Sequence, residues 1–142
     1  MMKPLLLATA LLLSACSQGE SLQQAHPLIQ AHVDAFNAQD AQAMAEVEHP
    51  DIEWFSVNDS EMSIEVSGRE NLTNFMESYF KSPVKTTGSL RDWSVNGDYV
   101  AVTETAKWKT SSGENKSQSS LTVYHIEDNL IRRVWYYPAV SN

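Results

Sequence analysis

The sequence has little cysteine and little positive charge. One cysteine stands among 142 residues, so no disulfide can form within the chain and a cysteine-rich metal site is excluded. Ten lysine and arginine residues face 18 aspartate and glutamate residues, which gives a formal net charge of −8 at pH 7. Because a surface of this charge repels phosphate, we expect no nucleic-acid partner. These two features exclude an internal disulfide and a cysteine-rich metal site and argue against nucleic-acid binding, but they do not indicate a particular function.

The composition is that of a single folded domain. Hydrophobic residues make up 42% of the chain and charged residues 20%, which supplies a core and excludes disorder as the main state. A length of 142 residues allows one ordinary domain, and the chain contains no internal repeat. We expect this domain at residues 26–142.

The N-terminal residues have the pattern of a bacterial signal peptide. Lys3 precedes a Leu- and Ala-rich run at residues 5–13, which is shorter than the roughly 20 apolar residues that cross a bilayer. The ending Leu-Ser-Ala-Cys at residues 13–16 resembles the lipobox of lipoproteins. The resemblance implies that residues 1–15 are a signal peptide and that Cys16 is acylated. The alternative is an ordinary secretory signal with an accidental cysteine.

The residues after Cys16 suggest where such a lipoprotein is sorted. Ser17 and Gln18 follow it, whereas lipoproteins kept at the inner membrane usually carry aspartate there. By this resemblance we expect a lipid anchor in the cell envelope, on the periplasmic face of the outer membrane. Residues 16–25 are polar and are expected to form a tether.

Three helices are expected in the first part of the domain. Pro27 suits the first turn of a helix whose apolar residues recur at helical spacing. Asp40 is expected to cap a second helix, and Ser67 a third that carries a stripe from Leu72 to Phe80. The expected ends are residues 37–40 for the first helix, His49-Pro50 for the second and Pro83 for the third.

The other segments alternate between apolar and polar residues, as strands do. Asn96-Gly97 is a strong signal for a two-residue hairpin. Helices on one face of a curved antiparallel sheet make an α+β domain. The expected strands are residues 51–57, 62–66, 84–95, 98–110, 115–126 and 130–137.

This order of elements carries a resemblance to a known superfamily. With Asn-Ala-Gln-Asp at 37–40, Asp-Ile-Glu-Trp at 51–54 and Ser-Gly-Arg-Glu at 67–70, the chain resembles nuclear transport factor 2-like proteins. The nearest branch is the SnoaL-like polyketide cyclases, with ketosteroid isomerases as relatives. The resemblance implies a cone-shaped α+β barrel, in which a curved antiparallel sheet wraps around the helices. This fold hosts enzymes, binding domains and assembly domains, so it implies no single function.

The residues of the steroid isomerases are not kept here. By resemblance, His32 stands where those enzymes have a tyrosine oxyanion donor, and Ser56 where they have the aspartate base. Their second acid falls near Thr122. Because a serine hydroxyl is too weakly basic to remove a proton beside a carbonyl unaided, we expect no steroid isomerase activity.

The resemblance implies a conical pocket, and strand alternation assigns the side chains that line it. By resemblance the inner rows include residues of the last two strands, where aromatic residues offer surfaces for an apolar or cyclic ligand. Such residues also simply fill cores. The candidate ligand-pocket residues are Trp54, Ser56, Trp108, Thr122, Tyr124, Arg133, Trp135 and Tyr137.

Two residues are candidate catalytic groups. Glu104 lies in an apolar row, where a carboxylate is costly unless it is paired or protonated. It is either a pocket acid or base, or a structural residue at the sheet rim or paired with Arg133. His32 is either a proton donor or acceptor on the helical wall, or a half-buried histidine bonded to a neighbour.

No metal and no cofactor are expected. His26 and His125 show no metal-ligand spacing, and His49 with Asp51 at a turn is a weak pair. The acidic residues from Asp34 to Glu53, Glu48 among them, are expected to form a solvated face.

Three hypotheses of function follow. The first is a lipid-anchored domain that binds a small, partly apolar molecule. The second is an isomerase, cyclase or lyase that uses Glu104 and His32. The third is an interaction module with a vestigial pocket. A cavity of about 300 Å³ or more would favour a bound ligand. A cavity plugged by Trp54 and Trp108 would favour the interaction module. A homodimer through the open sheet face is expected, as is common in this superfamily.

Overall fold

The computed structural model describes residues 26–142, which form an α+β domain. The predicted signal peptide, Cys16 and the tether lie outside the described residues. None of the helices in the described part is long and apolar enough to cross a membrane. Its elements are α1 (Pro27–Asn37), α2 (Ala41–Glu46), β1 (Glu48–Asn58), β2 (Glu61–Ser67), α3 (Arg69–Tyr79), β3 (Thr86–Asn96), β4 (Tyr99–Lys109), β5 (Asn115–Glu127), β6 (Leu130–Tyr136) and β7 (Val140–Ser141).

The strands form one sheet in the order β2-β1-β6-β5-β4-β3, and β7 pairs with β5. All pairs are antiparallel except β1 with β6, which run parallel with Glu53 beside Arg133. The expectation of a wholly antiparallel sheet was therefore wrong for this pair. The expectation failed because β6, the last long strand, pairs with β1 rather than with a strand next to it in the chain, and local alternation does not show such a pairing. The short strand β7 was not predicted.

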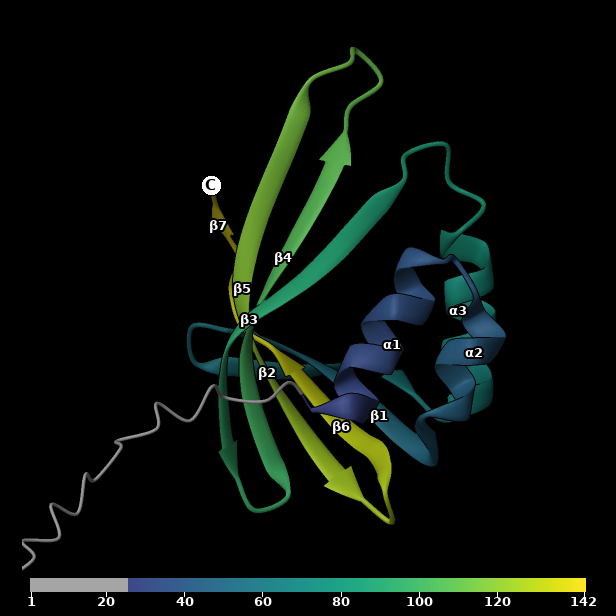
Figure 1. Ribbon diagram of the computed structural model, residues 1–142, viewed down its shortest axis with the longest axis vertical. Coiled ribbons are helices and arrows are strands. Elements are labelled where there is room, and N and C mark those ends of the chain that lie inside the picture. Colours follow the sequence, from purple (N-terminus) through teal and green to yellow (C-terminus); the bar gives the residue numbers. More distant parts are fainter. Residues whose placement is uncertain (1–25) are drawn as a thin grey trace, which may run out of the picture.

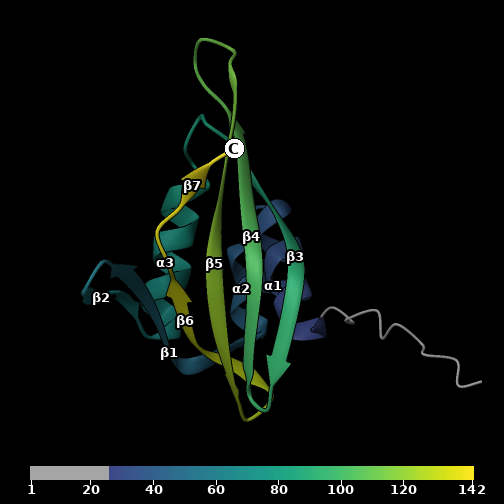
Figure 2. The same ribbon diagram turned by 90° about the vertical axis from the view of Figure 1, so that its left-hand side faces the viewer.

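The three helices cover one face of the curved sheet, and the opposite face is open (Figures 1 and 2). The core lies between the two layers. Ile29 of α1, Met44 of α2 and Leu72 of α3 are almost fully buried there against strand residues. The buried strand residues include Ile52, Val100, Val102, Tyr124, Ile131 and Val134. The predicted segregation of the helices on one side is confirmed.

The predicted signals of the first two helices are partly confirmed. Pro27 occupies the first turn of α1. The carboxylate of Asp40 accepts the backbone N–H of Ala43 at 2.9 Å, which caps α2. However, α2 ends at Glu46, and His49-Pro50 belong to β1. This proline is tolerated because the pairing of β1 with β6 is irregular between Glu48 and Glu53.

The predicted capping box of the third helix is wrong. The N-cap of α3 is Gly68, whose φ of 89° suits a residue without a side chain, and no side chain caps this helix. Ser67 ends β2, and its carbonyl oxygen accepts the side chain of Asn71 at 2.9 Å. The predicted apolar stripe of α3 is only partly buried, because Phe75 and Tyr79 are exposed.

Asn37, at the end of α1, fixes this helix to β3. Its Nδ2 donates to the carbonyl of Gly88 at 2.9 Å, and its Oδ1 accepts the N–H of Gly88 at 2.7 Å. A Cβ at position 88 would lie 3.3 Å from Cγ1 of Val33, so glycine permits this close approach. The helical layer is thereby held at a set distance from the sheet.

We expect Asn37→Ala to lower the free energy of unfolding by about 1–3 kcal/mol, because both backbone groups of Gly88 lose their partner. Denaturant unfolding followed by circular dichroism measures the change. Asn74→Ala, on the exposed side of α3, is the control and should change stability by less than about 0.5 kcal/mol. Equal effects of the two substitutions would contradict this role of Asn37.

Candidate functional site

A cavity of about 150 Å³ lies between the helices and the inner face of the sheet. Most of its wall is apolar and comes from all three helices. The strands contribute one residue each from β1, β4 and β6. Its lining residues are His32, Val33, Phe36, Met44, Trp54, Phe75, Met76, Tyr79, Glu104 and Tyr136.

Glu104 is the acidic group of the cavity wall. Its Oε2 accepts a hydrogen bond from the hydroxyl of Tyr124 at 3.0 Å. Burial raises the pKa of the Glu104 carboxyl, while the Tyr124 hydroxyl and the nearby His32 lower it by less. The net direction is upward. The predicted position of Glu104 on the inner face is confirmed, and its assignment as an acid or base stays a prediction.

Two tyrosines beside Glu104 remain protonated donors. Burial holds the pKa of Tyr124 well above its usual range, and the charge of Glu104 adds to this effect. Burial also holds the pKa of Tyr136 well above its usual range, again with a contribution from Glu104. Beside Glu104 the wall therefore offers hydroxyl groups, and the other candidate acid–base residue that lines the cavity is His32.

His32 and Glu48 form a second polar pair. Nε2 of His32 lies 2.9 Å from Oε1 of Glu48, and the two side chains are 4% and 1% exposed. Arg69 of α3 donates to the backbone carbonyl of Glu48 at 3.2 Å. The expectation that Glu48 belongs to a solvated acidic face was wrong. It begins β1 beneath the helices, where its carboxyl meets His32.

Two buried polar atoms on the inner side have no partner. Nε1 of Trp54 and Oγ1 of Thr122 make no hydrogen bond to any group in the described residues. Trp54 lines the cavity, whereas Thr122 lies beneath its wall on β5, where it pairs with Tyr136 of β6. An unpaired buried donor is costly, because it has lost its hydrogen bonds to water.

The predicted pocket residues divide into two groups. Trp54 lines the cavity with Glu104 and His32, and Thr122 and Tyr124 are fully buried on the same side. Ser56 and Trp108 do not line it. Trp108 lies near the end of β4, where it borders a different, open groove. The cavity is therefore not plugged by Trp108.

The predicted inner row of the last strand was wrong. Val134 is buried in the core and Tyr136 lines the cavity, while Trp135 stacks on Phe55 of the outer face at 5.5 Å between ring centroids. Arg133 and Tyr137 share the outer side with Trp135. The register shows why, since Tyr136 pairs with the inward residue Thr122. This pairing cannot be read from alternation within one strand.

The alternative pairing of Glu104 with Arg133 is also excluded. Nε of Arg133 donates to Oε2 of Glu53 at 3.1 Å, and its Nη1 lies 3.3 Å from Nδ1 of His125. These contacts are on the outer face, across the sheet from Glu104. Glu53 also accepts Arg132 at 3.1 Å, so it is a paired residue and not a solvated one.

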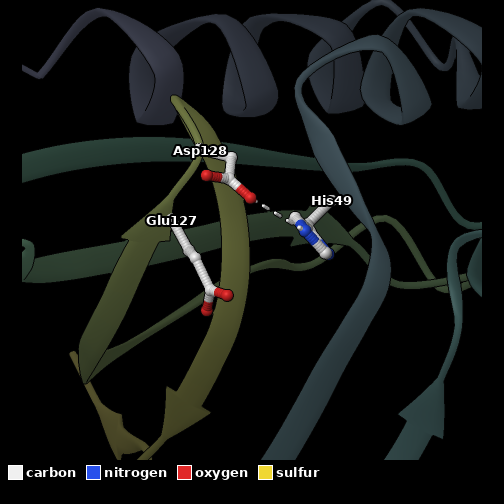
Figure 3. A group of neighbouring side chains, drawn as sticks. All are labelled: His49, Glu127 and Asp128. Carbon is white, nitrogen blue, oxygen red and sulfur yellow. Dashed lines mark ion pairs between the residues drawn. The ribbon is translucent and has the colours of Figure 1, made fainter.

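His49, Glu127 and Asp128 form a group with ligand-type atoms within 4.8 Å of one another (Figure 3). Nδ1 of His49 accepts the backbone N–H of Asp51 at 3.0 Å, so the proton of the neutral ring is on Nε2. Nε2 faces Asp128 at 3.8 Å and has no lone pair for a metal in this tautomer. Glu127 lies 3.8 Å from Nε of Arg132. We assign no metal to this group.

The family of the chain follows from comparison with family models. The model described as SnoaL-like domain matches residues 29–134. The chain belongs to this family. No curated protein matches the sequence.

Solved structures share the fold of this SnoaL-like domain. RV0760c from Mycobacterium tuberculosis, in complex with estradiol-17beta-hemisuccinate, is 15% identical with a TM-score of 0.65, covering 78% of this chain and 90% of that one. A putative polyketide cyclase from Xanthomonas campestris pv. campestris is 23% identical with a TM-score of 0.59, covering 78% and 87%. An M. tuberculosis epoxide hydrolase, LEH-like, is 13% identical with a TM-score of 0.63, covering 78% of each chain. At these identities the likeness shows the fold alone.

The raised pKa of Glu104 has a measurable effect on stability. The native SnoaL-like domain holds this proton more tightly than the unfolded chain, in which the pKa is about 4.3. Stability is therefore lost as pH rises from that value through the native pKa. We expect Glu104→Gln to raise Tm at pH 7 and to change it little near pH 4. A difference of one in pKa is worth about 1.4 kcal/mol, or roughly 5 °C for this size.

Calorimetry of both proteins at the two pH values tests this expectation. Glu114→Gln is the control, because Glu114 is an exposed residue of the β4–β5 turn. A lower Tm for Glu104→Gln at pH 7 would mean that the carboxylate is stabilised in the fold, and Glu104 would be rejected as an acid–base group.

Proposed function

We propose that the protein binds a small, partly apolar molecule in the cavity between its helices and sheet. The observation that carries this proposal is the cavity itself, which is apolar apart from a few polar groups and has an unpartnered indole N–H in its wall. Pockets of this composition are typical of small-molecule sites. The ligand complex of the fold neighbour RV0760c supports the proposal.

The size of the cavity limits the ligand. Its volume of about 150 Å³ is below the roughly 300 Å³ at which pockets for drug-sized molecules begin. An apolar protein cavity of about this volume accommodates benzene. We therefore propose a ligand of about one six-membered ring, and not a steroid.

The unpaired donor limits the chemistry of the ligand. Trp54 Nε1–H is buried and without a partner among the described residues. The ligand is therefore proposed to carry an acceptor oxygen, which would satisfy the indole N–H. Phenol and benzene form a matched pair of probes, because they differ only in this oxygen.

We expect phenol to bind the full chain, as measured by ligand-observed NMR, and Trp54→Phe to weaken this binding about fivefold, the equivalent of one hydrogen bond. Binding of benzene should change little in the same variant. Trp108→Phe, outside the cavity, is the control for loss of an indole. Failure of both probes to bind, or tighter binding of estradiol than of phenol, would contradict the proposal.

A second candidate function is acid–base catalysis on such a ligand. It is favoured by the presence of two polar pairs, Glu104 with Tyr124 and His32 with Glu48, at one cavity. Glu104 would transfer a proton as an isomerase, cyclase or lyase requires, and Glu48 would hold the His32 ring in position. A carrier leaves the C–H bonds of a bound ketone intact. An enzyme would exchange the hydrogens beside the carbonyl of cyclohexanone for deuterium in D₂O. Exchange that occurs with the wild type and is lost in Glu104→Gln would establish the enzyme.

We also propose that the protein is held by lipid at the periplasmic face of the outer membrane. The sequence Leu-Ser-Ala-Cys at residues 13–16 supports this. Expressed in a Gram-negative host, the protein should partition into detergent and carry the mass of an acylated N-terminus. Cys16→Ser should prevent cleavage at this site or release the protein. A soluble wild-type product with a free Cys16 would contradict the anchor.

A homodimer through the open sheet face is proposed as well. The outer face carries Ile64, Tyr99 and Leu121, which are 57%, 50% and 48% exposed, around the Phe55–Trp135 stack. Val134 and Tyr136 do not belong to this face, because they lie in the core and beside the cavity. Light scattering of residues 17–142 should give the dimer mass at micromolar concentration, and Leu121→Glu the monomer mass. Ser78→Glu on α3 is the control, and a monomeric wild type would contradict the dimer.

A further inference from the structure

Positive charge in the described residues gathers at one end of the sheet. Residues 81–91 and 105–119 hold six of the nine lysine and arginine residues in 26–142, and one acidic residue, Glu114. The rest of 26–142 holds three basic and sixteen acidic residues. This end joins the start of β3 to the long β4–β5 hairpin, which projects beyond the helices in Figure 1. The six basic residues are Lys81, Lys85, Arg91, Lys107, Lys109 and Lys116.

Two adjoining hollows lie at this basic end. One of about 790 Å³ is bordered by Lys85 and Lys116, with Trp108. The other, of about 380 Å³, is bordered by Arg91. Both are lined by Lys107, Ser117 and Asn142, so they adjoin each other. We call them together the basic trough; it follows the ends of β3, β4 and β5, near β7 in Figure 2.

The floor of the basic trough is made of hydroxyl and amide groups. Thr105 Oγ1 lies 2.8 Å from Ser119 Oγ, a cross-strand pair of β4 and β5. Nδ2 of Asn142 donates to Ser119 Oγ at 2.9 Å and to Ser117 Oγ at 3.3 Å. Ser119 Oγ also donates to Oδ1 of Asn142 at 3.3 Å, which completes its bonds, whereas the hydroxyls of Thr105 and Ser117 can each make a further bond. Such a surface suits a ligand that is itself rich in hydroxyl groups.

The charge of the basic trough is incompletely neutralised. Arg91 pairs with Asp92, and Lys116 lies 3.4 Å from Glu114. Nζ of Lys85 donates to a backbone carbonyl at 2.7 Å and keeps its charge. Lys107, which lines both hollows, has no acidic partner among the described residues. An anion would therefore be attracted to the middle of the trough.

We propose that the basic trough binds a linear anionic glycan of the polyuronate type. Its carboxylates would meet Lys107 and the flanking lysines, and its hydroxyls the Thr, Ser and Asn groups of the floor. The trough is separate from the cavity, and the proposal is independent of the function proposed there.

Two other anionic partners fit the observations less well. A lipid surface is bound by apolar side chains inserted among basic ones, whereas the trough floor is hydroxyl and amide. DNA presents phosphates and bases and no free hydroxyl groups along its chain, so it would leave the hydroxyl groups of the trough floor without matching partners. A polyuronate carries both a carboxylate and hydroxyl groups on each sugar, and so matches both the charge and the hydrogen-bonding groups.

The test is calorimetric titration of the full chain, in non-ionic detergent at about 25 mM NaCl, where surface charges are weakly screened. Hexagalacturonate should bind, and maltohexaose, its neutral counterpart, should not. Lys107→Gln should weaken the binding about tenfold, as expected for a charge-assisted hydrogen bond. Lys81→Gln removes the same charge outside both hollows and should change affinity less than about twofold.

Three results would overturn the proposal. The first is no binding of hexagalacturonate at this salt concentration. The second is an equal effect of Lys107→Gln and Lys81→Gln, which would mean that binding depends only on the net charge of the protein. The third is tighter binding of phosphatidylglycerol vesicles or of a thymidine decamer than of hexagalacturonate. Circular dichroism confirms that each variant is folded, so a loss of binding is not a loss of structure.

Discussion

One buried hydrogen bond joins the helical layer to the sheet, between Nε2 of His32 on α1 and Oε1 of Glu48 on β1. Either group alone would be a polar atom in a dry interior, which costs several kcal/mol. Arg69 of α3 binds the carbonyl of the same glutamate, so α1, β1 and α3 all meet at Glu48. The place of the cavity follows from this constraint, because the His32 ring is both the fixed point of α1 and part of the cavity wall.

The sequence predicted the order of the elements and the fold, since helical spacing and strand alternation reflect local physics. It also placed Glu104 on the inner face, because its neighbours Val102 and Ala106 are apolar. It failed where register between distant strands decides. The last strand was assigned the wrong face, and Glu48 was taken for a surface residue because five other acidic residues lie near it in the chain. The sequence around Glu48 contains no signal that distinguishes a glutamate buried beneath a helix from its exposed neighbours.

The two faces of the sheet differ in the side chains that they present. The inner face is largely apolar, and its polar groups include the Glu104–Tyr124 pair and the unpartnered Trp54 Nε1 and Thr122 Oγ1. The outer face divides along the strands into an aromatic half around Trp135 and the basic trough around Lys107. Because strand side chains alternate, changes on one face leave the other in place. A single sheet can therefore carry a cavity on one face and two surfaces of different character on the other.

The parallel pairing of β1 with β6 has a consequence for how the chain is made. Glu53 and its partner Arg133 are 80 residues apart. At about 5–20 residues per second, a ribosome takes roughly 4–16 s to deliver the second after the first. Throughout that interval one edge of β1 is an open template for other chains. A truncation before Leu130 would leave that edge of β1 unpaired.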